Sequence, residues 1–351
     1  MDRVFLGIDI GGQTIKGIAI GEDGIVKTKL ALPTKATEGA RAVVGVLGDV
    51  VDGLTAERRA LSVGVGTPGA VDAHGRIASI AVNIPGWDGT DIKSFIEGKL
   101  GVPVSVRNDG NLAAYAEWSA RGGRSSYLLF VGLGTGIGGG YIEDGKILGG
   151  VDDRALEIGH VIVWPGGRLC ACGKRGCAEA YASGPAVVKN AFELAKNHDS
   201  PLSRMILGLD AGGRQDRGDK FDKNSDRLGI SAEKVTPETV YEAFSKGDEL
   251  AVAVDSLVAD TLAKACATAI AILAPDCVVL GGGLMRGAPN LVKEVAERVG
   301  GYVYADALKG LTFEGALCGQ EAGLWGAALY GASAVLERVA LFKLARSTQI
   351  V

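Results

Sequence analysis

Three of the six cysteines lie close together in the stretch RLCACGKRGCAE, at positions 168–179. Three thiols cannot all pair in disulfides, and a disulfide between Cys170 and Cys172 would be strained. A structural zinc ion takes four tetrahedral ligands, and three thiolates with one imidazole satisfy it. His160 is within loop reach, ten residues upstream of Cys170, and two glycines inside the stretch let the chain fold back. We therefore expect a closed structural zinc site formed by His160, Cys170, Cys172 and Cys177.

Two carboxylates lie on either side of the expected zinc ligands, Glu157 in EIGH and Glu179 in GCAE. Carboxylates accept hydrogen bonds from hydroxyls, so a pair held rigidly by a metal loop suits a polyol ligand. A third carboxylate, Asp109, comes just after an expected strand at 102–107 and opens an expected helix. It is either the N-cap of that helix or a base that takes the proton of an attacking hydroxyl, and its sequence position does not decide between these roles.

Glycine-rich turns follow three expected strands, and such turns let backbone N–H groups approach phosphate oxygens. The first turn has Asp9 at the strand end, where a carboxylate could hold Mg²⁺ through water. None of the turns has the spacing of a Walker loop. The sequence therefore predicts an unusual phosphate site. Its candidate residues are Asp9, Gly11, Gly12, Thr14, Lys16, Gly134, Thr135, Gly136, Gly138, Gly282 and Gly283.

The elements that must position these residues occur twice. GIDIGGQTIKGIAIGEDG near the N-terminus and VGLGTGIGGGYIEDG near residue 131 share one order: strand, glycine turn, strand, acidic hairpin. This repeat predicts an α/β fold of two duplicated domains that face a cleft. The second half is mostly helical, with helices expected at 236–246 and 248–274, and the polar, aperiodic stretch 199–234 is expected to be a surface insertion.

Composition favours an ordinary soluble enzyme, because 47% of the 351 residues are hydrophobic, 22% are charged and the net charge is −4. The slight acidity argues against a broad nucleic-acid or membrane surface. We see no apolar run approaching the roughly 18 residues of a membrane span and no signal-peptide pattern. The expected location is the cytoplasm.

Motifs along nearly the whole chain resemble one family. They are DIGGQTIKG, GVGTPGAVD, NIPGW, RNDGN, GLGTGIGGG, EIGH, CACGKRGCAE and VVLGGG. Together they resemble the ROK family of sugar kinases and repressors, which have the actin-like ATPase fold. The resemblance implies that Asp109 is the catalytic base and that the glycine turns bind ATP. It also implies that His160 uses one ring nitrogen for zinc and the other for a sugar hydroxyl. The sugar contacts that it implies are Asn83, Asn108, Glu157, His160 and Glu179.

The resemblance also predicts the domain organisation. We expect a smaller N-terminal domain at 1–118, completed by a C-terminal helix at 335–351, and a larger domain at 119–334 that contains the zinc loop 157–179 and the insertion 199–234. Gln13 departs from the family pattern, which has Thr directly after Gly-Gly. Family repressors carry an N-terminal helix-turn-helix, whereas the first strand here is expected at residue 4, so DNA binding is not expected.

The predicted function is that of an ATP-dependent hexose kinase, which phosphorylates the 6-hydroxyl of glucose or a close relative with MgATP and contains a structural zinc ion. The motifs fit an N-acetylmannosamine or N-acetylglucosamine kinase equally well. A non-catalytic sugar-sensing protein is the alternative of another class. The resemblance implies a homodimer or homotetramer, and it leaves open a donor other than ATP, such as polyphosphate.

Overall fold

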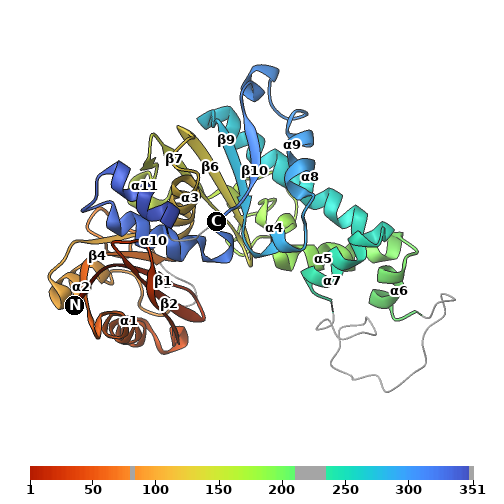
Figure 1. Cartoon of the computed structure of the whole chain (residues 1–351). Helices are drawn as coiled ribbons and strands as arrows, with labels where there is room; N and C mark the ends of the chain where they lie inside the picture. The colour runs from red at the N-terminus through yellow and green to blue at the C-terminus, as the bar shows by residue number, and fades with distance from the viewer. Residues whose placement is uncertain (80–83, 210–234, 348–351) are drawn as a thin grey trace.

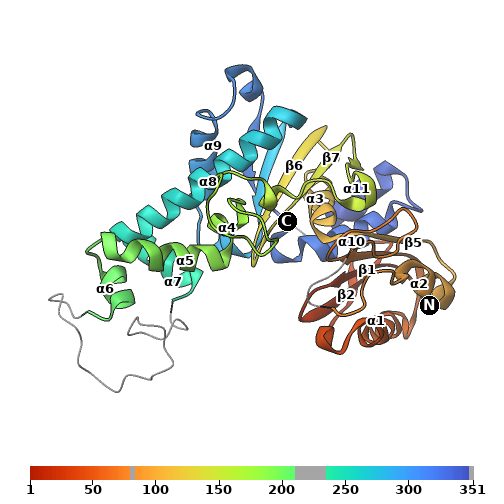
Figure 2. The same ribbon diagram turned by 180° about the vertical axis from the view of Figure 1, so that it is seen from behind.

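The computed structural model describes residues 1–79, 84–209 and 235–347. These residues form two five-stranded mixed sheets with helices between and outside them (Figures 1 and 2). The strands are β1 (Asp2–Ile10), β2 (Thr14–Gly21), β3 (Val26–Pro33), β4 (Arg58–Thr67), β5 (Val104–Asn108), β6 (Tyr127–Leu133), β7 (Ile137–Glu143), β8 (Lys146–Ile147), β9 (Cys277–Gly281) and β10 (Thr312–Gly315). The α-helices are α1 (Ala40–Thr55), α2 (Ile92–Leu100), α3 (Asp109–Ala120), α4 (Glu179–Ala182), α5 (Gly184–Leu194), α6 (Pro201–Leu207), α7 (Pro237–Ser245), α8 (Glu249–Leu273), α9 (Leu291–Val299), α10 (Ala322–Ala332) and α11 (Arg338–Ser347).

The two sheets have the same topology. The N-terminal sheet has the strand order β3-β2-β1-β4-β5, and the C-terminal sheet has the order β8-β7-β6-β9-β10. In each sheet the first three strands are antiparallel, and the next two join them in parallel. This correspondence confirms the predicted duplication, which the sequence signals only in the two hairpins that begin the sheets.

Helices cover both faces of the N-terminal sheet, which explains why β1 and β4 are almost continuously apolar. Helices α1 and α2 pack on one face, and α10 packs on β1 and β4 from the other. The contact with α10 is so close that a Cβ at Gly64 would lie 1.8 Å from the carbonyl oxygen of Ala327. Helix α3 lies beside α10 and also packs on β7, so these two helices fill the space between the sheets.

Helix α8 corrects one expectation from the sequence. The stretch Glu249–Leu273 has the length and the apolar composition of a membrane-spanning helix, although no apolar run of that kind was expected. The helix packs against α4, α5, α7 and α9 in the core of the C-terminal half, and 56% of its apolar window is buried. Its apolarity is therefore that of a central core helix.

Two other expectations fall partly or wholly outside the described residues. The segment 199–234 was expected to be irregular, but its first part forms α6, which Ser200 caps through the N–H of Ser203; residues 210–234 are not described. Asn83 also lies outside the described residues. The expected domain boundary at 118/119 stays a prediction, and α11 packs on α3 and α10 in a cluster that includes side chains of both sheets.

Candidate active site

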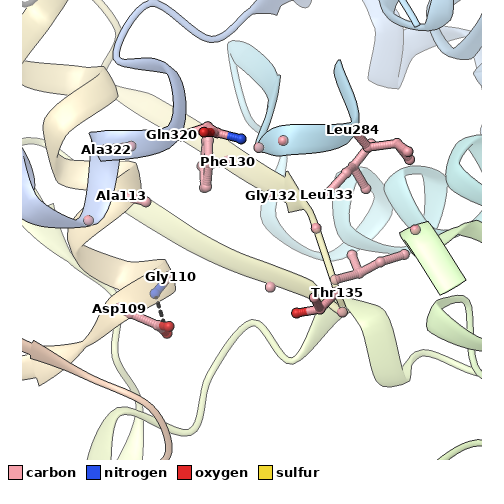
Figure 3. Close-up of a pocket in the computed structure, with 18 of the residues that line it drawn as sticks. Asp109, Gly110, Ala113, Phe130, Gly132, Leu133, Thr135, Leu284, Gln320 and Ala322 are labelled. Atoms are coloured by element: carbon pink, nitrogen blue, oxygen red, sulfur yellow. Dashed lines mark hydrogen bonds between the residues drawn. The ribbon is translucent and has the colours of Figure 1, made fainter. Parts of the chain in front are cut away.

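A cleft of about 900 Å³ lies between the two sheets and receives residues from both (Figure 3). Its walls come from the ends of β1 and β6, the start of α3, the loops that carry Glu157 and His160, and the turn after β9. Segments far apart in the sequence thus meet at one place. The sequence-predicted residues that line the cleft are Asp9, Lys16, Asp109, Gly134, Thr135, Gly136, Gly138, Glu157, His160, Glu179, Gly282 and Gly283.

Some sequence-predicted residues do not line this cleft. Gly11, Gly12 and Thr14 belong to the tight β1–β2 turn, in which the N–H of Gly11 donates to the carbonyl oxygen of Thr14 at 3.0 Å. The side chain of Asn108 is occupied with backbone groups: its Oδ1 accepts from Gly110 N at 2.9 Å, and its Nδ2 donates to the carbonyl oxygen of Gly69 at 3.2 Å.

Asp109 is the first residue of α3, and Asn108 is the N-cap of that helix. The alternative of Asp109 as the cap is therefore wrong, and its carboxylate is left facing the cleft, with Oδ1 accepting the N–H of Gly110 at 2.8 Å (Figure 3). Protein atoms surround the carboxylate although it is accessible through the cleft, and this desolvation raises its pKa to about 6. The negative charges of Asp9 and Glu157 contribute to the same rise in pKa, after desolvation.

Asp9 lies near the end of β1, directly opposite Lys16 on β2. Burial raises the pKa of Asp9, and the positive charge of Lys16 lowers it. A carboxylate that is costly to ionise in a partly buried position gains most from a nearby cation. The position and chemistry of Asp9 therefore fit a role in holding a divalent ion near bound phosphates.

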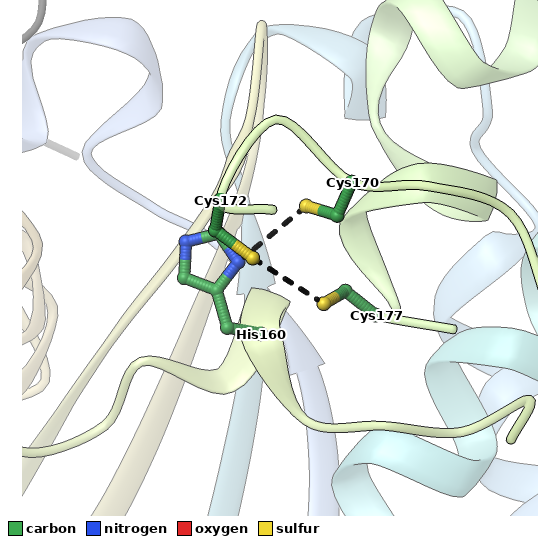
Figure 4. Close-up of side chains that lie close together, drawn as sticks. All are labelled: His160, Cys170, Cys172 and Cys177. Carbon is green, nitrogen blue, oxygen red and sulfur yellow. Dashed lines mark hydrogen bonds between the residues drawn. The ribbon is translucent and has the colours of Figure 1, made fainter. Parts of the chain in front are cut away.

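The four predicted metal ligands form a compact cluster (Figure 4). Their ligand atoms all lie within 4.8 Å of one another; Cys170 Sγ is 3.7 Å from His160 Nδ1, and Cys172 Sγ is 3.6 Å from Cys177 Sγ. Two thiolates bound to one zinc at about 2.3 Å would lie roughly 3.7 Å apart, so this spacing fits a tetrahedral ion. Because Nδ1 faces the sulfurs, Nε2 is the ring nitrogen left for another partner.

The local chain explains how three cysteines converge. The N–H of Cys170 donates to the carbonyl oxygen of Lys174, and Gly173 and Gly176 adopt φ angles of 83° and 88°, which glycine reaches without strain. Ile162 pairs with Cys177 in an isolated β-bridge, which joins the cysteine loop to the strand-like segment after His160.

Glu179 connects the cysteine cluster to the glycine turn between β6 and β7. Its Oε2 accepts the N–H of Ile137 at 2.9 Å, and its Oε1 lies 3.7 Å from Cys170 Sγ. A Cβ at Gly136 would lie 2.5 Å from Oε2, so the turn and the carboxylate are in direct contact.

The turn after β9 is packed against the end of β6. Gly282 has a φ of 92°, and a Cβ there would lie 2.2 Å from the carbonyl oxygen of Leu133. Gly134 in turn accepts the N–H of Gly184 at the start of α5. Two glycine turns and a helix start thus form one wall of the cleft.

Several residues of this wall were not expected from the sequence. Glu238, Arg286 and Gln320 line the cleft, and so does Gln13, the residue that departs from the family pattern. Glu238 follows Thr236 and Pro237, a recognisable helix start, but nothing in that pattern indicates a ligand. Arg286 and Glu238 attract each other, and the positive charge of Arg286 contributes to the lowered pKa of Glu238, after hydrogen bonds from its own backbone N–H and from Thr236.

Two sheets of one topology, a cleft between them and glycine turns at the ends of β1, β6 and β9 define the actin-like ATPase fold. The chain belongs to the ROK family, whose family model matches residues 5–333.

Similar proteins cover nearly the whole chain. A glucokinase from Thermotoga maritima is 30% identical over 335 residues, covering 95% of this chain and 98% of the relative. An N-acetylmannosamine kinase from Escherichia coli is 31% identical, covering 92% of this chain and 97% of the relative. Among solved structures, a ROK family glucokinase from Streptomyces griseus in complex with glucose and AMPPNP has a TM-score of 0.70 and 28% identity, covering 94% of this chain and 99% of that one.

Proposed function

We propose that the chain is an ATP-dependent hexose kinase that phosphorylates the 6-hydroxyl of glucose or a close relative. The observation that carries this proposal is the carboxylate of Asp109, which opens onto the same cleft as the glycine turns and has a pKa of about 6. A base with this pKa is ionised at neutral pH, yet it still binds a proton more tightly than an ordinary carboxylate does. The relatives named glucokinase support the choice of substrate.

Asp109 would take the proton from the sugar hydroxyl as its oxygen attacks the terminal phosphorus of ATP. Its fixed position at the start of α3 orients it for this transfer, since the N-cap Asn108 and the N–H of Gly110 hold the turn. Phosphoryl transfer needs little covalent help from the protein and depends mainly on position and charge. Lys16 adds a positive charge to the phosphate side of the cleft.

ATP would bind along the wall formed by the glycine turns, where backbone N–H groups can approach phosphate oxygens. Asp9 would hold Mg²⁺, which when bound neutralises charge on the phosphates. Gly282 and Gly283 would lie against the nucleotide, and Gly134, Thr135, Gly136 and Gly138 would face the phosphates.

The sugar would be held by the residues around the cysteine cluster. Glu157 and Glu179 can accept hydroxyl hydrogen bonds, and His160 would use Nε2 for a hydroxyl while Nδ1 binds zinc. Asn108 keeps a second N–H on Nδ2 for the sugar, and Asn83 is proposed as a further contact. The zinc ion, held by His160 with Cys170, Cys172 and Cys177, would be structural.

An N-acetylmannosamine kinase is the second candidate, favoured by the relative of that name at 31% identity. A panel of glucose, mannose, N-acetylmannosamine and N-acetylglucosamine in an ADP-release assay separates the two by their kcat/KM values. The same panel with polyphosphate in place of ATP tests the donor. Failure of every sugar to release ADP would contradict both kinase assignments and favour a non-catalytic sugar-sensing protein.

We further propose a cytoplasmic protein that forms a homodimer or homotetramer and binds neither nucleic acid nor membranes. Its expected domains are 1–118, completed by 335–351, and 119–334. Light scattering after size-exclusion chromatography measures the assembly, and a monomer at micromolar concentration would contradict it.

A further inference from the structure

The segment directly before Glu157 has an unusual backbone. Asp152, Asp153 and Leu156 have φ angles of 54°, 55° and 63°, and they are three of the six non-glycine residues with positive φ among the described residues. L-residues adopt this region at a cost, and such residues persist only where surrounding contacts hold them. The contacts of this segment are therefore informative.

Asp153 is almost fully buried, with 1% of its side chain exposed, and both carboxylate oxygens have partners. Oδ1 accepts from Arg107 Nη1 at 2.5 Å, and Oδ2 accepts the backbone N–H of Asn108 at 3.1 Å. The packing is tight, because a Cβ at Gly149 would lie 2.1 Å from Oδ1. Asp153 follows β8 of the C-terminal sheet and thus binds the end of β5 in the N-terminal sheet.

Arg107 is held on its other side by Tyr330 of α10. Its Nε and Nη2 donate to the hydroxyl of Tyr330 at 3.1 and 2.8 Å, and its guanidinium carbon is 5.2 Å from the centre of that ring. Tyr330 packs edge-on against Tyr115 of α3. The guanidinium of Arg107 is rigid and is held on both sides. The position of Asp153 therefore determines where Arg107, and with it the end of β5, lies.

The same segment makes two more contacts with the N-terminal half. The N–H of Val71 donates to the carbonyl oxygen of Asp152 at 2.9 Å, and Arg154 Nη2 donates to the carbonyl oxygen of Ala78 at 2.9 Å. The segment therefore bridges the two halves of the molecule. It leads into Glu157 along the chain, and it contacts the Asn108–Asp109 peptide of the other half.

We infer that Asp153 is a positioning residue for phosphoryl transfer: by holding Arg107 and the Asn108 amide, it sets the place of the Asp109 carboxylate relative to Glu157. Asn108 caps α3, and Asp109 is the next residue, so a shift of the Asn108 amide moves the base directly. The role rests on the proposed function. This positioning role explains why Asp153, and not glycine, occupies a left-handed backbone position in which glycine would be free of strain.

The test replaces Asp153 by glycine, which removes the carboxylate and relieves the backbone strain. We expect kcat with the best sugar to fall about tenfold to a hundredfold, as for other small misplacements of a reacting group, while the KM values for sugar and ATP change less than about threefold. A purely structural residue would lower the melting temperature and leave kcat unchanged.

Asp152→Gly is the matched control. It relieves strain at the neighbouring residue, where φ is 54° and the carboxylate meets only the half-exposed Arg154 among the described residues, and it keeps the carbonyl that binds Val71. Its kcat should stay within about twofold of the parent value. An Asp153→Gly variant with parental kcat, or an equal loss in both variants, would overturn the positioning role while leaving the kinase assignment intact. Absence of turnover in the parent with every sugar would overturn both.

Discussion

The carboxylate of Glu179 accepts the N–H of Ile137 at 2.9 Å and at the same time lies 3.7 Å from Cys170 Sγ. One side chain therefore joins the cysteine cluster to the glycine turn between β6 and β7. In a kinase of this design, the ion that orders the cysteine loop would also order the turn that meets the phosphates. Sugar binding and ATP binding are then expected to depend on each other through Glu179.

Glu179→Gln and Glu179→Ala separate the two parts of this connection. Glutamine keeps an oxygen that can accept from Ile137, so we expect a higher sugar KM with an ATP KM within about twofold of the parent value. Alanine leaves that N–H without its acceptor, which typically costs about 1–3 kcal/mol, and both KM values should rise. Steady-state kinetics with each substrate varied in turn measures this, and equal effects of the two variants would contradict the link.

Asp109→Asn should abolish most of the catalysis without disturbing the fold. The amide keeps an oxygen for the N–H of Gly110 but cannot accept a proton at neutral pH, so kcat should fall by about 10² to 10⁴. Sugar affinity, measured by calorimetry, should change little. Turnover near the parent value in a variant of unchanged circular dichroism would show that another group is the base.

The pH dependence follows from the same residue. Because burial raises the pKa of Asp109 to about 6, kcat/KM should fall as the pH is lowered through about 6 and the carboxylate becomes protonated. The folded protein binds this proton more tightly than the unfolded chain does, so the contribution of Asp109 to the unfolding free energy should decrease as the pH rises from about 4 to about 6. Denaturant titrations of the parent and of Asp109→Asn, compared across that range, measure this contribution, and identical profiles would contradict the raised pKa.

Cys172→Ser tests the metal site with little loss of packing, since Cys172 is exposed while Cys170 and Cys177 are buried. We expect zinc affinity to fall by more than about tenfold and the sugar KM to rise, because the loop that carries Glu179 loses its anchor. Ala171→Ser, at the exposed position beside it, should retain one zinc per chain. Metal analysis after dialysis against a chelator gives the answer, and full zinc content in Cys172→Ser would refute its role as a ligand.

Gly282→Ala should disturb the nucleotide wall. Its φ of 92° and the 2.2 Å approach of a Cβ to the Leu133 carbonyl would force the turn to move, at a cost above about 1 kcal/mol in stability and with a raised ATP KM. At Gly315, which does not line the cleft, a Cβ would meet nothing within 4 Å, so Gly315→Ala is the matched control. Thermal melts and ATP titrations distinguish the two, and equal losses would argue against the packing of Gly282 as the cause.

Local patterns were sufficient where one short stretch contains all the information. The cysteine loop needs only its own glycines and a histidine within reach, and the cluster at His160, Cys170, Cys172 and Cys177 forms as predicted. The expected helices at 236–246 and 248–274 correspond to α7 and α8, because Thr236-Pro237 and Asp248 are strong helix starts. The repeated hairpins likewise predict the start of each sheet.

The rest depended on residues that only the fold brings together. The sequence left Asp109 as either the cap of α3 or a base, whereas in the structure Asn108 is the cap and its amide N–H contacts Asp153. Glu238, Arg286 and Gln320 reach the cleft from three separate elements, with no spacing that would mark them.

The sequence by itself determined the duplicated α/β fold, the cysteine loop and the family, since these follow from local periodicity, turn chemistry and short motifs. The tertiary structure alone decided the raised pKa of Asp109, the anchor of Glu179 and the strained bridge at Asp153. Burial, charge proximity and backbone strain arise between segments that are distant in sequence, so they exist only once the two sheets have packed around their shared helices.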